Sequence, residues 1–172
     1  MEFLKNTITE AMLDRRSIRA YTDEKLTDDE LYTILQCGLW APSGRNDQTA
    51  KFVATQNKEL LHAIAADMGE NVVLGYDAPC FIFVFDLLEG RWTPDNADFA
   101  LMNMHLAAYS LGLGSIMIGM CREFMRSEKG REWQKKMGIP DNYHFICGLA
   151  VGHTAAPTPP RPRNEENIIV LP

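Results

Sequence analysis

Metal-binding and disulfide patterns are missing from this chain of 172 residues. Its four cysteines, Cys37, Cys80, Cys121 and Cys147, are widely spaced and form no C-x-x-C pair. That spacing excludes a zinc ribbon and a ferredoxin-type cluster. Cys80 and Cys147 lie in apolar runs, where a thiol behaves as a small buried hydrophobe. The sequence therefore predicts a reduced, cytoplasmic protein without a metal.

Positive charge and long apolar segments are also scarce. The chain has 17 Lys and Arg against 23 Asp and Glu, a net charge of −6. This acidic balance argues against a nucleic-acid partner whose phosphates must be neutralised. The first residues, Met1–Asn6, lack the apolar core of a signal peptide. Residues 99–121 carry no Asp, Glu, Lys or Arg, but polar residues and glycines interrupt them, so we expect a buried helix and strand and no membrane span.

Helical and extended patterns alternate along the chain. Capping boxes are expected at Thr7–Glu10 and Thr27–Glu30, because a threonine followed three residues later by glutamate closes a first helical turn. Alternation of strands and helices predicts one layered α/β domain over residues 1–172, of the α+β class. Further helices are expected at 57–68, 93–111 and 122–137, and strands at 52–55, 80–85, 115–119 and 145–151.

The helix expected at 93–111 is unusually apolar. Thr93 is expected to be its N-cap, with Pro94 at the first helical position. Alanine, leucine and methionine occur on all its sides, which is typical of a helix buried in the core or at a subunit interface. Asn103 and His105 on this helix are more readily explained as hydrogen-bonded core groups than as ligands.

The segment Arg15–Arg19, with the sequence RRSIR, holds three guanidinium groups and a hydroxyl within five residues. Arginine binds phosphate through two parallel N–H groups. In an acidic chain, this segment indicates an anion site for the phosphate and polar ring edge of a nucleotide-like cofactor. The alternative is a helix C-terminus whose cations suit the helix dipole.

Three further stretches have the composition of a cofactor site. The turn at 41–48 offers hydroxyl and amide groups that suit the edge of a heteroaromatic ring, although alone it could be a well-capped loop. Residues 112–119 are glycine-rich but lack G-x-G-x-x-G and lead into a strand, which excludes a Rossmann dinucleotide turn. Glycine there would let a flat ring lie against the backbone. In Arg161-Pro162-Arg163 the proline favours extended backbone, so both guanidinium groups can reach one anion.

The C-terminal segment contains two unlike parts. Residues 155–163 are proline-rich and cannot form a helix or a central strand. Residues 168–172 are apolar, and an apolar terminus is expected to dock on a surface. That surface could belong to the same subunit or to a partner.

In this order, the motifs R-R-S-x-R, P-S-x-x-N-x-Q and L-G-L-G-S-x-x-I-G, followed by prolines with closing arginines, resemble the FMN-dependent nitroreductase family. The likeness extends from about residue 15 to residue 163. It implies a nitroreductase-like central mixed sheet flanked by helices, with a C-terminal arm extending over the partner subunit. It also implies a homodimer with FMN sites at the subunit interface.

The resemblance further implies which residues bind FMN. The first motif would contact its phosphate, ribityl chain or ring, the second would approach from the other subunit, the third would lie near the reactive edge, and the closing arginines would contact the phosphate. In the same order these residues are Arg15, Arg16, Ser17 and Arg19; Pro42, Ser43, Gly44, Asn46 and Gln48; Met117, Ile118 and Gly119; and Arg161 and Arg163.

By the same resemblance, NADH or NADPH would reduce FMN at N5, and a nitroaromatic, quinone or similar flat acceptor would reoxidise it in a ping-pong scheme. No catalytic side chain is implied. The chain departs from the family at Gln48–Ala50, where Gln-Pro-Trp is common, and has only Gly90–Trp92 where larger members carry inserted helices. A dehalogenase or flavin-fragmenting enzyme, a flavin sensor or storage protein, and an anion-binding module without flavin stay open as alternatives.

Overall fold

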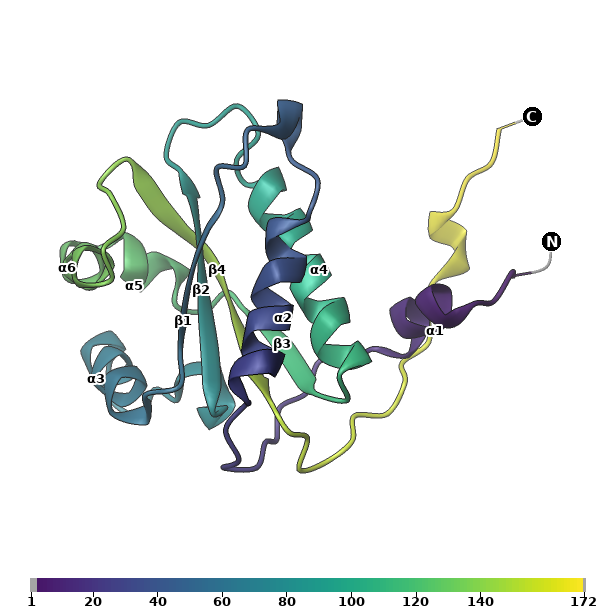
Figure 1. Cartoon of the computed structure of the whole chain (residues 1–172), viewed down its shortest axis with the longest axis horizontal. Coiled ribbons are helices and arrows are strands. Elements are labelled where there is room, and N and C mark those ends of the chain that lie inside the picture. The colour runs from purple at the N-terminus through teal and green to yellow at the C-terminus, as the bar shows by residue number, and fades with distance from the viewer. Residues whose placement is uncertain (1–2, 172) are drawn as a thin grey trace.

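The computed structural model describes residues 3–171 and forms three layers, with a four-stranded sheet between two groups of helices (Figure 1). The helices are α1 (Thr7–Asp14), α2 (Asp28–Leu39), α3 (Lys58–Met68), α4 (Asp95–Ser110), α5 (Arg122–Arg126) and α6 (Glu128–Lys136). The strands are β1 (Lys51–Thr55), β2 (Cys80–Leu87), β3 (Gly114–Ile118) and β4 (Tyr143–Gly152), and short 3₁₀ turns are η1 (Gly44–Asn46), η2 (Leu74–Asp77) and η3 (Glu165–Asn167).

The sheet has the strand order β1-β2-β4-β3, and its three strand pairs are antiparallel. One isolated bridge, between Ser17 and Ser115, is parallel. Through this bridge the segment after α1 lies alongside β3. Figure 1 shows α2 and α4 on one face of the sheet and α3, α5 and α6 on the other. α1 and the C-terminal segment project together from the body.

The two faces of β2 belong to two separate hydrophobic cores. Ile82 and Val84 pack in the core beneath α2 and α4. Phe81 and Phe83 pack in the core beneath α3, α5 and α6, together with Phe145 of β4. Burial on both faces explains the continuous apolar runs of β2 and β4, since each fully buried large side chain contributes about 1.5–3 kcal/mol. The four expected strands are thus confirmed, with shifts of one or two residues at their ends.

Helix starts were predicted with mixed success. The box at Thr27–Glu30 is confirmed. At α1 the predicted N-cap Thr7 is wrong, because the Asn6 side chain, one residue earlier, accepts from the backbone N–H groups of Ile8 and Thr9, both at 3.0 Å. At α4, Thr93 is not the N-cap, since its N–H closes a turn onto the Gly90 carbonyl and the helix begins at Asp95.

The single helix predicted at 122–137 is wrong, because two helices meet at Ser127. Ser127 is extended, with φ −69° and ψ 168°, and its side chain accepts from the N–H of Gly130 as the N-cap of α6. Gly130 lies so close to α5 that a Cβ there would be 2.1 Å from the carbonyl oxygen of Phe124. A glycine at this position therefore permits the sharp break.

Burial of α4 is confirmed on one side only. Ala97, Ala100 and Met104 are buried against the sheet. Phe99 is 50% exposed and Met102 40% exposed on the outer side. Within a single chain α4 is therefore covered on one side only, and a subunit interface on its outer side stays a prediction.

Two cysteines behave as their apolar surroundings predict. Cys80 and Cys147 are buried in the core around α2 and α4, and burial raises the pKa of both thiols to about 12. Between residues 3 and 171 no helix is both long and apolar enough to cross a bilayer. In the same range no three His, Cys, Asp or Glu residues are grouped to hold a metal ion.

We predict that Gly130→Ala lowers the free energy of unfolding by about 2 kcal/mol or more, because the added methyl group meets rigid backbone of α5. Urea denaturation measures the change. Lys135→Ala, on the exposed side of α6, is the control and should change stability by about 0.5 kcal/mol or less. Equal stability of the two variants would contradict the packing of Gly130 on Phe124.

Candidate cofactor site

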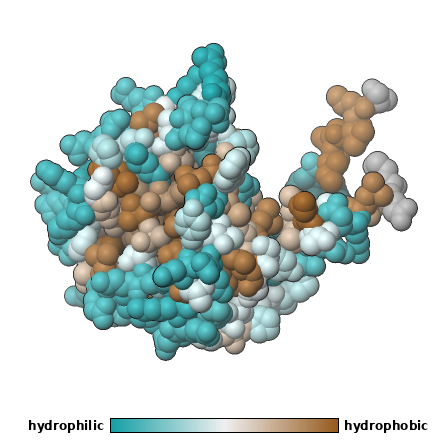
Figure 2. Space-filling model, in the orientation of Figure 1, coloured by the Kyte–Doolittle hydropathy of each residue, from teal (hydrophilic) through white to brown (hydrophobic). Residues whose placement is uncertain are grey.

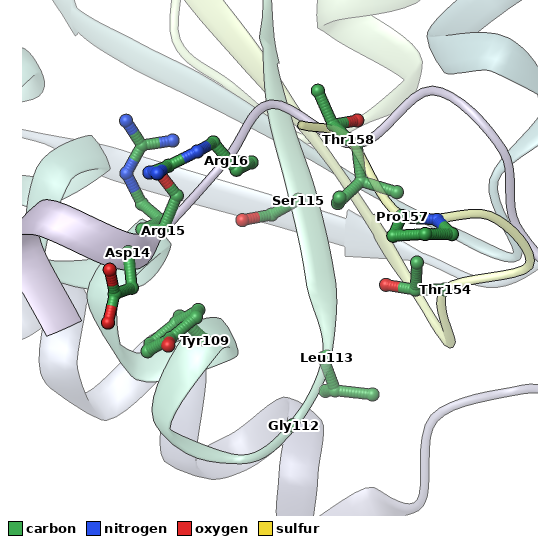
Figure 3. A pocket seen from close by; sticks show the side chains of 11 residues that line it. Asp14, Arg15, Arg16, Tyr109, Gly112, Leu113, Ser115, Thr154, Pro157 and Thr158 are labelled. Atoms are coloured by element: carbon green, nitrogen blue, oxygen red, sulfur yellow. The ribbon is translucent and has the colours of Figure 1, made fainter. Parts of the chain in front are cut away.

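A cavity of about 240 Å³ opens where α1 ends, beside the last turn of α4 and the start of β3 (Figure 3). Figure 3 shows the two arginines on one side of it and the segment after β4 on the other. Segments far apart in sequence therefore meet here. The lining residues are Asp14, Arg15, Arg16, Ile18, Tyr109, Gly112, Leu113, Ser115, Thr154, Pro157 and Thr158.

Local backbone structure places the arginines. Arg15 ends α1 with ψ 135°, and its N–H still donates to the Ala11 carbonyl at 3.0 Å. The chain then runs extended along β3, where Ser17 pairs with Ser115 and the Ile18 N–H donates to the Ser115 carbonyl at 3.1 Å. The arginine-rich segment is thus a helix end followed by an extra strand-like segment, and both features hold it beside the cavity.

The two guanidinium groups are incompletely satisfied. Across residues 3–171, no carboxylate lies within 4.0 Å of Arg15 or Arg16, and the buried Nε of each has no hydrogen-bond partner. Arg16 donates only to backbone carbonyls of Leu13 and Arg15. A buried donor without a partner costs about 1–3 kcal/mol. An anion in the cavity would remove that cost.

Three positively charged side chains lie near one another at this cavity. Burial lowers the pKa of Arg15, and the positive charges of Arg16 and Arg163 lower it further. Arg163 therefore lies within electrostatic reach of Arg15, although it comes from the opposite end of the chain. Arg161 is exposed, and its carbonyl accepts a hydrogen bond from Arg163 at 3.3 Å.

His105 and Ser115 form a buried polar pair that the sequence analysis did not assign to the site. His105 Nδ1 lies 2.8 Å from Ser115 Oγ, and the serine lines the cavity. Burial, with a smaller effect from Arg15, lowers the pKa of His105 from 6.5 to about 4. The imidazole is neutral at pH 7 and adds no fourth positive charge. The position of Ser115 in the L-G-L-G-S motif was the only available signal for this pair.

The other residues of the first motif have different surroundings. The Ser17 carbonyl accepts from the Thr158 hydroxyl at 3.2 Å, which ties the C-terminal segment to the arginine segment. Arg19 points to Tyr76 of η2, with its Nε 3.3 Å from the phenol oxygen. Ser17 and Arg19 therefore do not line the cavity in the single chain.

The loop of the second motif lies at the other end of α4. The Gly44 N–H donates to the Asn96 side chain at 2.9 Å, and Asn96 in turn donates to Asp47 at 2.8 Å. Asn96 and Tyr109 are thirteen positions apart in the sequence, or about 20 Å along the helix. The loop carrying Pro42, Ser43, Gly44, Asn46 and Gln48 is thus separated from the arginine cavity of its own chain.

This loop has a fixed, uncommon backbone. Arg45, Asn46 and Gln48 have φ values of 57°, 59° and 49°, in the left-handed region that non-glycine residues rarely adopt. The ring of Trp92 packs on Gly44, where a Cβ would lie 2.2 Å from the ring. Trp92 therefore supplies a large aromatic contact to a loop that lacks the common Gln-Pro-Trp sequence.

β3 is an edge strand, and its end is open. The Met117 side chain is 46% exposed, whereas Ile118 is buried in the core beneath α3. A Cβ on Gly119 would meet only the Met117 sulfur, at 3.8 Å. Space beside the backbone of 117–119 suits a flat ring, and the Ile118 side chain is directed away from it.

A larger apolar groove of about 780 Å³ adjoins the cavity through Tyr109 and Gly112. Its walls come from α1, the end of α2 and the outer side of α4, and Trp40 on its rim is 84% exposed. Residues 168–171 are also apolar and 71–82% exposed, visible as the brown terminal segment in Figure 2. Such contiguous apolar surface is typical of an interaction site.

We predict that replacing His105 by Asn reduces the loss of stability in acid. The unfolded chain protonates His105 below about pH 6.5, whereas the folded chain does so only near pH 4. The unfolded state then binds more protons in this interval, so wild-type stability falls as the pH is lowered through it. At about pH 4.5 the penalty is about 2 kcal/mol. Urea denaturation at pH 7 and at about pH 4.5 measures the free energy of unfolding of both proteins. An equal decrease in wild type and in the variant would contradict a neutral buried imidazole.

The chain resembles known proteins over most of its length. The model of the Nitroreductase family matches residues 12–74 and 70–153. An NADPH-flavin oxidoreductase from Vibrio harveyi is 29% identical over 182 residues, which cover 97% of this chain and 73% of that protein. An FMN reductase from Bacillus subtilis that uses NAD(P)H is 28% identical over 180 residues, covering 92% of this chain and 70% of that protein.

Among solved structures, a nitroreductase with bound FMN from Bacteroides fragilis superimposes with a TM-score of 0.90. The two chains are 26% identical, and the match covers 98% of this chain and 100% of that chain. The likeness therefore includes the terminal segments as well as the sheet. This chain belongs to the nitroreductase family.

Proposed function

We propose that this protein is an FMN-dependent oxidoreductase that takes electrons from NADH or NADPH and reduces a flat acceptor, such as a nitroaromatic or a quinone, by a ping-pong mechanism. The buried Nε atoms of Arg15 and Arg16, which have no hydrogen-bond partner, and the lack of a carboxylate beside either arginine carry this proposal. A dianionic phosphate provides the acceptors that these donors lack. The flavin activities named for the relatives from Vibrio harveyi and Bacillus subtilis support it further.

The donor set of the cavity fits the phosphate end of FMN. Arg15 and Arg16 would hold the phosphate, with Arg163 adding a third positive charge from the C-terminal segment. Ser115 lines the same cavity and its hydroxyl can contact the phosphate or the ribityl chain, whereas the Thr158 hydroxyl donates to the Ser17 carbonyl. The family's assignment of Ser17 and Arg19 to the ribityl chain or ring remains part of the proposal.

The residues of this chain bind and orient, and the reaction needs no nucleophile or general base among them. Bound FMN would supply the two-electron chemistry, accepting hydride from NAD(P)H and delivering it to the acceptor. The backbone of Met117, Ile118 and Gly119 would support the ring, since the end of β3 is open there. N–H groups next to the ring would stabilise negative charge that develops on it.

A homodimer would complete the site. The loop with Ser43, Asn46 and Gln48 is held at the Asn96 end of α4, about 20 Å along the helix from the Tyr109 end that lines the arginine cavity, and this separation favours contact with the cofactor of another subunit. The apolar groove beside α4 and the exposed segment 168–171 supply surfaces that pairing would cover. We propose that Arg161 and Arg163 close the phosphate site of their own chain and that the arm beyond them, with the exposed segment 168–171, lies over the partner.

The decisive experiment is the visible absorption spectrum of the FMN-reconstituted protein during anaerobic addition of NADH and then NADPH. Bleaching of the flavin by either nucleotide is the expected result, and the faster donor identifies the preferred one. A bound flavin that neither nucleotide reduces would favour a sensor or storage protein. A protein that stays colourless with FMN would refute the proposed cofactor.

We predict that Arg15→Ala weakens FMN binding by about 1.5–3 kcal/mol, the contribution of one charge-assisted contact. Quenching of FMN fluorescence on titration measures the dissociation constant. Lys135→Ala, which removes an exposed cation of α6 that lines neither cavity, is the control and should leave the constant unchanged. Equal affinities of the two variants would remove Arg15 from the phosphate site.

We predict that Trp40→Asp gives a folded monomer with weakened FMN binding. Trp40 is 84% exposed in the single chain, so the substitution removes little intrachain packing, but it places a charge in the groove proposed as the interface. Sedimentation velocity gives the mass, and circular dichroism checks the fold. Val73→Asp, another exposed apolar position, should remain dimeric. A dimeric Trp40→Asp protein with normal FMN affinity would place the interface elsewhere.

A further inference from the structure

A second polar cavity, of about 350 Å³, lies at the opposite end of α4 from the arginine cavity. It continues into an adjoining hollow of about 290 Å³, and Leu88, Arg126 and His144 belong to both. The walls come from the loop after β2, the start of α4, α5 and the first part of β4. The residues lining the larger part are Leu88, Thr93, Pro94, Asp98, Arg122, Arg126, His144 and Ile146.

Buried polar atoms without partners concentrate around this cavity. Within residues 3–171 there are five such side-chain atoms, and two are the Nε atoms of Arg15 and Arg16. The other three are Thr93 Oγ1, His144 Nδ1 and Asp86 Oδ2. Thr93 and His144 line the cavity, and Asp86 is the cross-strand neighbour of His144. Because native proteins satisfy most buried polar atoms, this grouping marks the cavity as a candidate site for a polar ligand.

Three arginines give the cavity a positive character. Arg122 is held by a 2.8 Å bond from Nε to the Ile146 carbonyl, which leaves its terminal nitrogens available. Arg131 is held by a 2.7 Å bond from Nη1 to the Tyr143 carbonyl and lines the adjoining hollow. Arg126 is exposed at the mouth. In the part of the chain that the structure describes, no carboxylate lies within 4.0 Å of these guanidinium groups.

One carboxylate and one imidazole accompany the arginines in this cavity. Asp98 lines the cavity, and burial raises its pKa while Arg122 opposes that effect. The pKa of His144 is lowered by burial first and then by Arg126 and Arg131, with Asp86 acting in the opposite direction. His144 is therefore kept neutral, so one ring nitrogen can accept and the other can donate a hydrogen bond.

We propose that this cavity is a second anion-binding site, which takes the phosphate or carboxylate group of a small molecule. Arg122 and Arg126 bind the anionic group, and Thr93 and His144 bind the neighbouring polar atoms of the ligand. The Arg122 N–H donates to the Gly119 carbonyl at 3.0 Å, so the site begins one turn beyond the open end of β3. It goes beyond the proposed FMN function and is built from other residues.

The test uses the FMN-loaded protein, so that the arginine cavity is already filled. Inorganic phosphate is titrated while the histidine ring resonances are followed by NMR, with His144 assigned from the spectrum of His144→Asn. We expect a saturable shift of His144 and no comparable shift of the exposed His62. Arg126→Gln should raise the dissociation constant about tenfold. Lys135→Gln, on the exposed side of α6, should leave it unchanged.

Lack of a saturable His144 shift, or equal phosphate affinity in wild type and Arg126→Gln, would overturn the second site. The visible spectrum of bound FMN, recorded on the same samples, keeps this outcome separate from failure of the cofactor proposal. Adenosine 2′,5′-bisphosphate and benzoate distinguish the sources of the anion. If the bisphosphate binds more tightly than phosphate, the ligand of this site is NADPH. If benzoate binds more tightly, the ligand is an aromatic acceptor that carries a carboxylate.

Discussion

The pairing of the segment after α1 with β3 determines where the chemistry of this protein can occur. The Ser17–Ser115 bridge and the bond from the Ile18 N–H to the Ser115 carbonyl fix this extra strand. They hold Arg15 and Arg16 beside the last turn of α4. Thr158 then bonds to the outer carbonyl of Ser17 and brings the C-terminal segment to the same place. Without this pairing, the arginines would extend into solvent, where a phosphate contact is weak.

Bringing Arg15, Arg16 and Arg163 together concentrates positive charge at one place. Burial lowers the pKa of Arg15, and Arg16 and Arg163 lower it further, because the three positive charges repel one another. The surroundings limit this cost, because the His105 imidazole beside Ser115 is neutral. A bound phosphate reverses the balance, since it supplies negative charge and hydrogen-bond acceptors together. Cofactor binding and stability of the fold should therefore be strongly coupled.

Features that depend on residues close together in the sequence could be predicted from the sequence alone. Thr27 and Glu30 form their capping box within one turn, the apolar runs become strands, and two of the three clustered arginines, Arg15 and Arg16, line a cavity. The sequence did not predict features that depend on competition between neighbouring residues or on contacts between separate elements. Asn6 replaces Thr7 as a cap because it is a better acceptor one residue earlier. The contacts of Asn96 with the loop at 43–48, and of His105 with Ser115, join residues distant in sequence and leave no periodic signal.

The helix α4 relates the two halves of the proposed site. One end bears the arginine cavity through Tyr109 and Gly112, and the other holds the loop at 43–48 through Asn96. In a two-fold symmetric dimer each surface meets its own copy. If two copies of α4 pack antiparallel, the loop end of one helix lies beside the arginine end of the other. The loop and the arginine cavity, which lie about 20 Å apart along α4 within one chain, would then lie close together between chains. The two-fold symmetry would produce two such sites in each dimer. In the proposed dimer, the apolar outer side of α4 would be the surface that brings the two halves of each flavin site together.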